Sequence, residues 1–357
     1  MLSNSRMVYL FIYVSDLARS REFYETKLGL RVIEEDEGCV KFDTGHVILA
    51  LNRVADYPGY GIQLPAGNDG SADIVFLVED VWEMRNSLSQ RGVEFHPVDW
   101  YQPGGIADFY DPDGHWLSLY QPSAEAMTWP SGDRIRAIVS RRTGINADRA
   151  IDRFGVPPRA VERRNEFDPK LVERGLDGCE LIYLFLFVFD ARAAQSFYYN
   201  ALGLRAVEGG PCSQLSNGDE EGVVKYDGGG IIVATHHIEP QRTPEEVEEH
   251  VCPPRELVEG RLKSVAPTFH VDDLDAEVCA LKLARPDIPI RRGEAVIGKI
   301  ASLEDPSGHL MFLYQPSDWA MAQPSGRKLA EILALPLEGA CVNTSIATPV
   351  ADAVAVS

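Results

Sequence analysis

Hydrophobic positions along the chain change their spacing in a fixed order, from the pattern of a strand to that of a helix and back. Near the N-terminus, Tyr9–Val14 is a short aromatic and β-branched run that predicts a strand. Asp16 follows as a candidate helix N-cap, and apolar residues then recur at helical spacing up to Gly29, a candidate C-cap. Three more strand-like runs follow, at 30–34, 39–42 and 47–51. The pattern predicts a β-α-β-β-β module.

The same order of elements returns three more times. The rest of the first half predicts a helix at 80–90 among strands at 73–78, 93–96, 106–110 and 116–120. The second half predicts helices at 192–202 and 274–282 among strands at 183–188, 223–226, 231–235, 266–271, 300–303 and 310–314. Four β-α-β-β-β modules, two in each half, therefore follow, and the fold class is α+β.

Long stretches of the two halves are nearly the same, so the chain is an internal duplication. LYQPSAEAMTWPSGDRIRAIV from Leu119 matches LYQPSDWAMAQPSGRKLAEIL from Leu313, and YLFIYVSDLARSREFYETKLGL from Tyr9 matches YLFLFVFDARAAQSFYYNALGL from Tyr183. The repeat exceeds the roughly 20–50 residues of a solenoid unit, which indicates two homologous domains. We expect these domains at 1–124 and 180–318, joined by a linker with a short helix at 125–179 and followed by a partly disordered extension at 319–357.

Composition limits the partners. The chain has 357 residues, is 45% hydrophobic, and carries a formal charge of -20 from 54 acidic and 34 basic residues. Such a surface repels phosphate backbones and anionic lipids, so we expect neither nucleic acid nor a membrane as partner. No apolar run approaches the roughly 20 residues of a membrane span, and we expect a cytoplasmic protein. The six cysteines show no CxxC spacing, which argues against a zinc knuckle or a redox pair.

Four motifs recur in the same order in both halves. Each half has a strand ending in V-x-D, then FY-x-x-x-LG-L, a second V-x-D, and D-P-x-G-H before the last strand, at Asp111 and Asp305. This combination, over 7–123 and 181–317, resembles the vicinal oxygen chelate superfamily, which includes glyoxalase I, extradiol dioxygenases and bleomycin-resistance proteins. The resemblance implies that two modules pair their sheets into a cup for a small molecule, giving two cup-shaped domains in tandem.

The resemblance also implies where a metal would bind. Most catalytic members of that superfamily hold a divalent metal with His, Gln and Glu from four strands. Here the equivalent positions fall on Tyr9, Asp73, Tyr183 and Ala266 in first strands, near Leu49 and Val233 in fourth strands, and on Ser118 and Phe312 in last strands. Only Asp73 is a ligand that hard or borderline metals prefer. We therefore expect no metal and no cofactor.

Several histidines lie at turns or strand ends. His115 and His309 follow the D-P-x-G turns, where histidine hydrogen-bonds the turn; an alternative interpretation brings His46 against His115. His270 shares a strand face with Ala266 and is a candidate general base.

Aromatic side chains line the predicted cups instead of metal ligands. Alternation with period two places Phe11 and Tyr13 on the face of Tyr9. We expect Asp73 beside Tyr9 as the pair with acid-base potential, because burial raises a carboxyl pKa and a phenol can donate to an oxyanion. The last strand adds Ser118 and Tyr120 to the first cup, and the second cup is expected to comprise Tyr183, Phe185, Phe187, Thr235, His237, Thr268, His270, Phe312 and Tyr314.

Three functions fit these residues. The first is a metal-free binding protein, similar to bleomycin-resistance proteins, that holds a small apolar or aromatic molecule. The second is a metal-independent isomerase, cyclase or lyase whose acid, base or oxyanion donor is Asp73, Tyr9, Tyr183 or His270. The third is a metal-dependent lyase or dioxygenase with its ligands elsewhere. We expect a monomer in preference to a homodimer, because duplication replaces the two-fold pairing of single domains. The Glu- and Pro-rich insertion at 240–262 is either a lid or a solvated loop.

Overall fold

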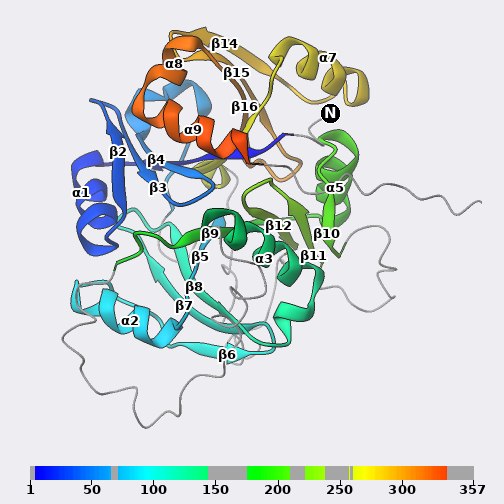
Figure 1. The fold of residues 1–357 in the computed structure, drawn as a ribbon. Helices are drawn as coiled ribbons and strands as arrows, with labels where there is room; N and C mark the ends of the chain where they lie inside the picture. The colour runs from blue at the N-terminus through cyan, green and yellow to red at the C-terminus, as the bar shows by residue number, and fades with distance from the viewer. Residues whose placement is uncertain are drawn as a thin grey trace, which may run out of the picture.

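The computed structural model describes residues 5–65, 71–143, 175–209, 222–237, 257 and 260–335, and Figure 1 shows them as a coloured ribbon. The strands are β1 (Met7–Val14), β2 (Arg31–Glu35), β3 (Cys39–Asp43), β4 (Ile48–Arg53), β5 (Ala72–Leu77), β6 (Asp99–Tyr101), β7 (Gly104–Tyr110), β8 (Trp116–Pro122), β9 (Glu180–Val188), β10 (Ala206–Glu208), β11 (Val223–Asp227), β12 (Ile232–His237), β13 (Val265–His270), β14 (Arg291–Ala295), β15 (Gly298–Glu304) and β16 (Leu310–Pro316). The α-helices are α1 (Leu17–Glu22), α2 (Val81–Gln90), α3 (Pro130–Thr143), α5 (Ala191–Gln195), α7 (Leu274–Ala284), α8 (Asp318–Ala322) and α9 (Pro324–Ala334). Among the described residues, no helix is long and apolar enough to cross a membrane.

These strands form two eight-stranded sheets, and each sheet takes one module from each half of the chain. The first sheet has the order β14-β15-β16-β13-β1-β4-β3-β2, and the second has the order β10-β11-β12-β9-β5-β8-β7-β6. The junctions are antiparallel, β1 with β13 and β5 with β9. The α+β class with four modules in two sheets is confirmed.

The expected pairing of the two modules within each half is wrong. The first module pairs with the fourth and the second with the third, so neither 1–124 nor 180–318 contains a complete sheet. The physical reason is that β1, β5, β9 and β13 carry similar buried apolar runs, so the hydrophobic pattern offers each of them several partners.

Local signals in the sequence are largely confirmed. The Asp16 carboxylate accepts a hydrogen bond from the Arg19 backbone N–H at 3.0 Å, and Gly29 has a φ of 74°. The expected helix at 17–28 changes into a π-helical turn, η2 (Phe23–Lys27), and the second half repeats it as η8 (Ser196–Ala201). The strand expected at 93–96 reduces to a single bridge between Phe95 and Phe109.

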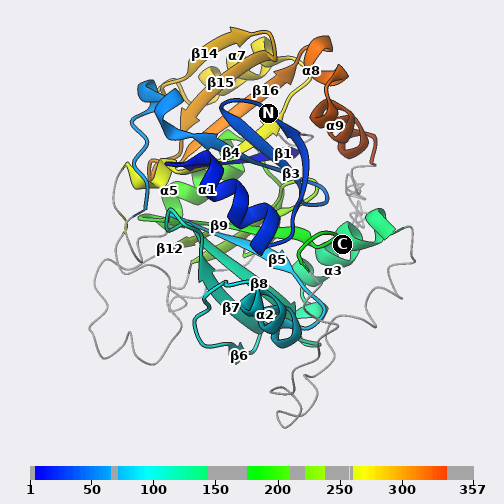
Figure 2. The ribbon, with the colours of Figure 1, turned by 90° about the vertical axis from the view of Figure 1, so that its left-hand side faces the viewer.

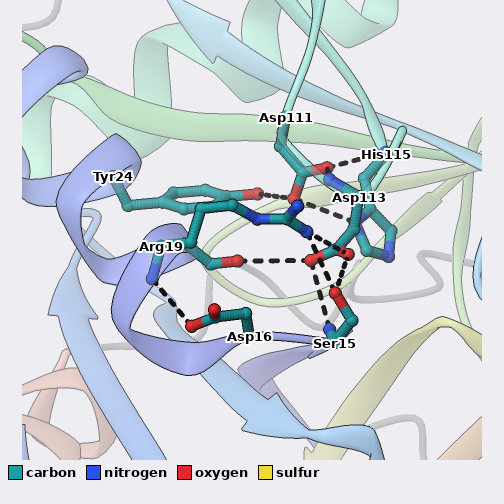
Figure 3. A network of polar contacts seen from close by, with 8 residues as sticks. Ser15, Asp16, Arg19, Tyr24, Asp111, Asp113 and His115 are labelled. Carbon is teal, nitrogen blue, oxygen red and sulfur yellow. Dashed lines mark hydrogen bonds and ion pairs between the residues drawn. The ribbon is translucent and has the colours of Figure 1, made fainter.

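The two sheets are joined within each half by a contact between repeated motifs. The Tyr24 hydroxyl, on η2, donates to the Asp111 carboxylate at 3.1 Å, and His115 Nδ1 lies 2.9 Å from the same carboxylate (Figure 3). Burial alone would raise the pKa of Asp111, but His115 and backbone N–H groups hold it below its ordinary value. In the second half, Tyr198 donates to Asp305 at 2.9 Å.

The prediction for His115 is confirmed, whereas the side chains of His309 and His46 have other partners than predicted. His115 bonds the D-P-x-G turn, as expected. His309 Nε2 instead lies 2.7 Å from the Phe187 carbonyl oxygen, so this histidine ties the turn to β9. The alternative interpretation that brought His46 against His115 is wrong, because His46 Nδ1 pairs with the buried Glu180 carboxylate at 3.1 Å.

The repeated P-S-G segments form α3 and α9, and each helix covers part of the concave face of one sheet. Leu329 and Ile332 of α9 pack against Tyr9 on the first sheet. Ile135 and Ile138 of α3 pack against Tyr183 on the second. Figure 2 shows the two helices apart, each against its own sheet. The short helix expected in the linker is therefore present as α3, whereas residues 144–174, most of the 240–262 insertion and 336–357 lie outside the described residues.

Candidate functional site

The positions that the family resemblance assigns to metal ligands lie on the concave faces of the sheets, except for the two positions in fourth strands. Leu49 and Val233 point to the opposite face, into the core beneath the outer helices. The strand registers, Phe11 with Ala50 and Phe185 with Ala234, place two alanines on the concave face instead. The corrected sets are Tyr9, Ala50, Ala266 and Phe312 on the first sheet, and Asp73, Ser118, Tyr183 and Ala234 on the second.

Neither set fits a divalent metal. Each offers at most one carboxylate, whereas such ions need several oxygen or imidazole ligands that converge on one point. The described part of the chain also holds no cluster of three His, Cys, Asp or Glu side chains positioned to bind an ion.

The concave face of the first sheet is filled by the chain itself. Tyr57 packs edge-on against Tyr13 with ring centroids 5.0 Å apart, and Tyr60 packs edge-on against Phe312 at 5.7 Å. Arg291 Nη1 holds this segment in place through the Gly59 carbonyl oxygen at 2.6 Å. We call this face, with α9 over its other end, the filled cup. It contains the predicted ligand-binding residues Phe11, Tyr13, Thr268, Phe312 and Tyr314 and the predicted catalytic residues Tyr9 and His270.

On the second sheet α3 covers one end of the concave face. Tyr183 and Tyr120 lie beneath it with ring centroids 5.9 Å apart, and the Tyr120 hydroxyl donates to the Pro103 carbonyl oxygen at 2.8 Å. Burial raises the pKa of Tyr183, so its phenol stays neutral. The other end of this face carries side chains of mixed character, and we call it the acid half-cup: Asp73, Asp108, Tyr110, Trp116, Ser118, Phe185, Phe187 and His236.

Two carboxyl groups meet through one hydroxyl at the centre of the acid half-cup. Ser118 Oγ lies 2.7 Å from Asp73 Oδ1 and 2.7 Å from Asp108 Oδ1. A serine hydroxyl has one proton to donate, so it can serve only one of two carboxylates as a donor. The second short contact requires a proton on one of the carboxyls. The geometry therefore describes a pair that shares a proton through Ser118.

The surroundings favour that shared proton. Burial raises the pKa of Asp73 well above its ordinary value, and the nearby Asp108 adds to the rise. Burial also raises the pKa of Asp108, opposed by Ser118, by the Trp116 indole and by His96. The indole is close enough to have this effect, although its N–H forms no hydrogen bond of normal geometry. One carboxyl is thus an acid and the other a base in the same place.

A continuous arc of rings surrounds the carboxyl pair. Tyr110 and Trp116 have centroids 6.2 Å apart, Trp116 and Phe187 are 6.0 Å apart, and Phe187 and His236 are 5.8 Å apart. Phe185 neighbours Asp73 across the β5–β9 junction. Asp73, Tyr110, Phe185 and His236 are only partly buried, so part of each side chain is exposed to solvent. Flat, largely apolar rings with a few polar groups are typical of a site for a planar organic molecule.

The structure thus brings together only some of the predicted site residues. Asp73, Ser118, Phe185 and Phe187 share the acid half-cup, with Tyr183 and Tyr120 next to them under α3. The expected pairing of Asp73 with Tyr9 is wrong, because these residues lie on different sheets. Thr235 and His237 lie on the opposite face of β12, since their register partners Leu186 and Val188 belong to the outer core.

Sequence reasoning missed Asp108, Tyr110 and Trp116, and assigned His237 to the cup in place of His236. A signal for Asp108 was present, because an aspartate inside an otherwise apolar strand contradicts strand preference and indicates a local role. Its partner Ser118 lies directly opposite in the β7–β8 register.

Comparison with known proteins gives matches at two levels. The sequence model of the Glyoxalase/Bleomycin resistance protein/Dioxygenase superfamily matches residues 6–119. Two uncharacterized proteins of Bacillus subtilis (strain 168), YwkD and YraH, are 29% and 28% identical over 122 and 125 residues, which is 32% of this chain and 94% and 98% of theirs.

Solved structures match almost the whole chain. Glyoxalase I from Zea mays has a TM-score of 0.51 at 16% identity, with 92% of this chain and 95% of that chain covered. A putative dioxygenase from Bacillus subtilis has a TM-score of 0.50 at 14% identity, with 93% and 98% covered. At these identities the likeness concerns the fold.

Proposed function

We propose that this chain belongs to the glyoxalase, bleomycin-resistance protein and dioxygenase superfamily, and that within this fold it binds one small aromatic molecule in the acid half-cup, without a metal. The observation that carries the proposal is the ring arc from Tyr110 to His236 around the Asp73 and Asp108 pair. The binding is one to one, because Tyr57 and Tyr60 occupy the corresponding face of the first sheet. We also infer a monomer, since both sheets are completed within one chain.

The internal repeat supplies a matched test. Phe185 and Phe11 occupy equivalent positions in β9 and β1, one in the acid half-cup and one in the filled cup. Isothermal titration with planar aromatic compounds should give one site per chain. Phe185→Leu should weaken that binding about tenfold or more, because it removes ring contact, whereas Phe11→Leu should leave affinity unchanged. Binding that is weakened by Phe11→Leu would contradict the proposal. So would the absence of binding by the wild-type protein.

Acid-base catalysis is a second candidate function, favoured by the carboxyl pair itself. A carboxylate and a carboxylic acid bridged by one hydroxyl can accept a proton from one atom of a bound substrate and return one to another, which is the step of an isomerase or a lyase. Asp73→Asn keeps the shape of the side chain and removes its basicity. A catalytic pair predicts near-normal affinity and a loss of turnover of roughly 10²- to 10⁴-fold, whereas a binding protein shows no turnover of any bound compound.

A further inference from the structure

We propose that the molecule bound in the acid half-cup is a planar organic cation, of the class of N-alkylated or protonated nitrogen heteroaromatics, and that it displaces the proton shared through Ser118. This inference rests on the proposed binding function and specifies the chemistry of its ligand.

The first support is the charge balance of the second sheet. Two other acids of this sheet have basic partners: Glu208 pairs with Lys225 at 2.6 Å, and Asp227 pairs with Arg134 at 2.6 Å. Within the described residues, Asp73 and Asp108 form no ion pair with a lysine or arginine, and their hydrogen-bond contacts converge on Ser118. Once the shared proton leaves, two negative charges remain in a mostly buried place, and an incoming cation would stabilise them.

The second support is the ring arc. The faces of tryptophan, tyrosine and phenylalanine attract cations, most strongly where water is excluded. Trp116 is only 7% exposed, so the ring face that it presents beside the acids is largely shielded from water. A flat cation would therefore be attracted both by the ring faces and by the two carboxyl groups, whereas a flat anion would be repelled by Asp73 and Asp108.

The third support is the balance of protons and charge at the carboxyl pair before and after binding. Before binding, the pair carries one proton and one negative charge; a cation with charge +1 enters and a proton leaves, so the net charge of the site is conserved. Affinity should therefore increase with pH until the pair is fully ionised. The titratable groups that face the pair are Tyr110, whose pKa burial raises to about 12, His96 and Asp99 beside Asp108, and His236 on β12.

Three probes of nearly equal shape test the inference on the full chain: 1-methylquinolinium as the cation, 1-methylnaphthalene as the neutral analogue and 1-naphthoate as the anion. Isothermal titration in two buffers of different ionisation enthalpy measures affinity and the number of protons released. We expect the cation to bind at least tenfold more tightly than the neutral probe. Its affinity should rise with pH, with release of protons on binding, and the neutral probe should show neither effect.

Asp73→Asn should abolish proton release and reduce the preference for the cation at least tenfold. Asp108→Asn provides a second variant if Asp73→Asn does not fold, and Asp133→Asn, which removes an acid that is 72% exposed on α3, should change nothing. Equal binding of all three probes, still weakened by Phe185→Leu, would overturn the cation inference and leave the proposed function intact. Absence of binding by every probe would overturn both.

Discussion

Tyr24 donates a hydrogen bond to Asp111 at 3.1 Å, although the two residues belong to modules whose strands lie in different sheets. The second half repeats the contact between Tyr198 and Asp305 at 2.9 Å. In both halves the tyrosine comes from the FY motif and the aspartate from the D-P-x-G-H turn. Two motifs far apart in sequence thus form one interlock, which explains why both copies of the duplication retain them.

Loss of either interlock should destabilise the protein. Tyr24→Phe or Tyr198→Phe removes a donor from a buried carboxylate, at an expected cost of about 1–3 kcal/mol in the free energy of unfolding. Urea denaturation measures the change. The neighbouring Tyr199 is 40% exposed, so Tyr199→Phe is the control and should have little effect. If both interlock variants match this control, the hydrogen bonds do not stabilise the fold.

The shared proton predicts an unusual dependence of stability on pH. The folded-state pKa of Asp73 is raised, so the native state binds more protons than the unfolded state above the unfolded pKa of about 3.9. This contribution is fully present below that value and is lost as the pH rises through the folded pKa. Asp73→Asn cannot lose a proton, so its melting temperature relative to wild type should be higher at pH 8 than at pH 4. A constant difference at all pH values would mean that Asp73 ionises normally.

Metal content gives a separate prediction. Because neither concave face offers more than one carboxylate at the four positions, protein purified without affinity-tag metal should contain far less than one equivalent of Zn, Ni, Mn, Fe or Co. A metal bound only to the native state adds stability by mass action, so a chelator should leave the melting temperature unchanged. Elemental analysis and thermal denaturation with and without chelator measure both. Stoichiometric metal, or a clear drop in melting temperature, would overturn the metal-free proposal.

Much of the architecture follows from local sequence. The remainder depends on which distant strands pair with one another, and local sequence does not encode that pairing. Apolar alternation and caps such as Asp16 predicted the modules, because these signals act within a few residues. The strand β14 was not predicted, since all five of its residues are exposed and leave no hydrophobic pattern. At Leu49 an error of one residue inverted the assigned face, because side chains alternate with a period of two.

The site was only half predictable for the same reason. Asp73 and Ser118 follow from counting within one module, but Phe185 reaches them through the junction of β5 with β9, from the other half of the chain. A hydrophobic run in β5 fits β9 or β1 about equally well. The choice between them depends on contacts between modules, including the interlocks at Asp111 and Asp305, which no single stretch of sequence contains.

The crossed pairing of modules predicts how separated halves behave. Residues 1–143 alone would expose the edges of β1 and β5, and residues 175–357 alone would expose those of β9 and β13. Unpaired edges with apolar faces promote self-association, so each half alone should aggregate or form oligomers. Produced together, the halves should co-purify as a 1:1 complex, measured by size-exclusion chromatography with light scattering. Two halves that are each stable monomers would contradict the observed sheet order.

The helices α3 and α9 are attached to their sheets by the same arrangement of a glutamate, a lysine and a serine. On the second sheet, Glu208 accepts hydrogen bonds from Lys225 at 2.6 Å and from Ser131, at the start of α3, at 2.6 Å. On the first sheet, Glu34 accepts from Lys41 at 2.5 Å and from the Ser325 backbone N–H of α9 at 2.9 Å. Burial raises the pKa of both glutamates, but these donors outweigh it and leave each pKa below its ordinary value.

Glu208→Gln and Glu34→Gln should therefore lower the free energy of unfolding by similar amounts, about 1–2 kcal/mol at pH 7, because charge-assisted hydrogen bonds become neutral ones. The difference from wild type should shrink as the pH falls, since a depressed carboxyl pKa stabilises the fold above the unfolded value of about 4.3 and loses that effect below the folded value. Ligand affinity separates the two variants. Glu208 secures the helix beside the acid half-cup, so Glu208→Gln should weaken binding, whereas Glu34→Gln, on the filled cup, should leave binding unchanged. Weakened binding in both variants, measured by titration at pH 7, would show that ligand affinity follows overall stability and not the position of α3.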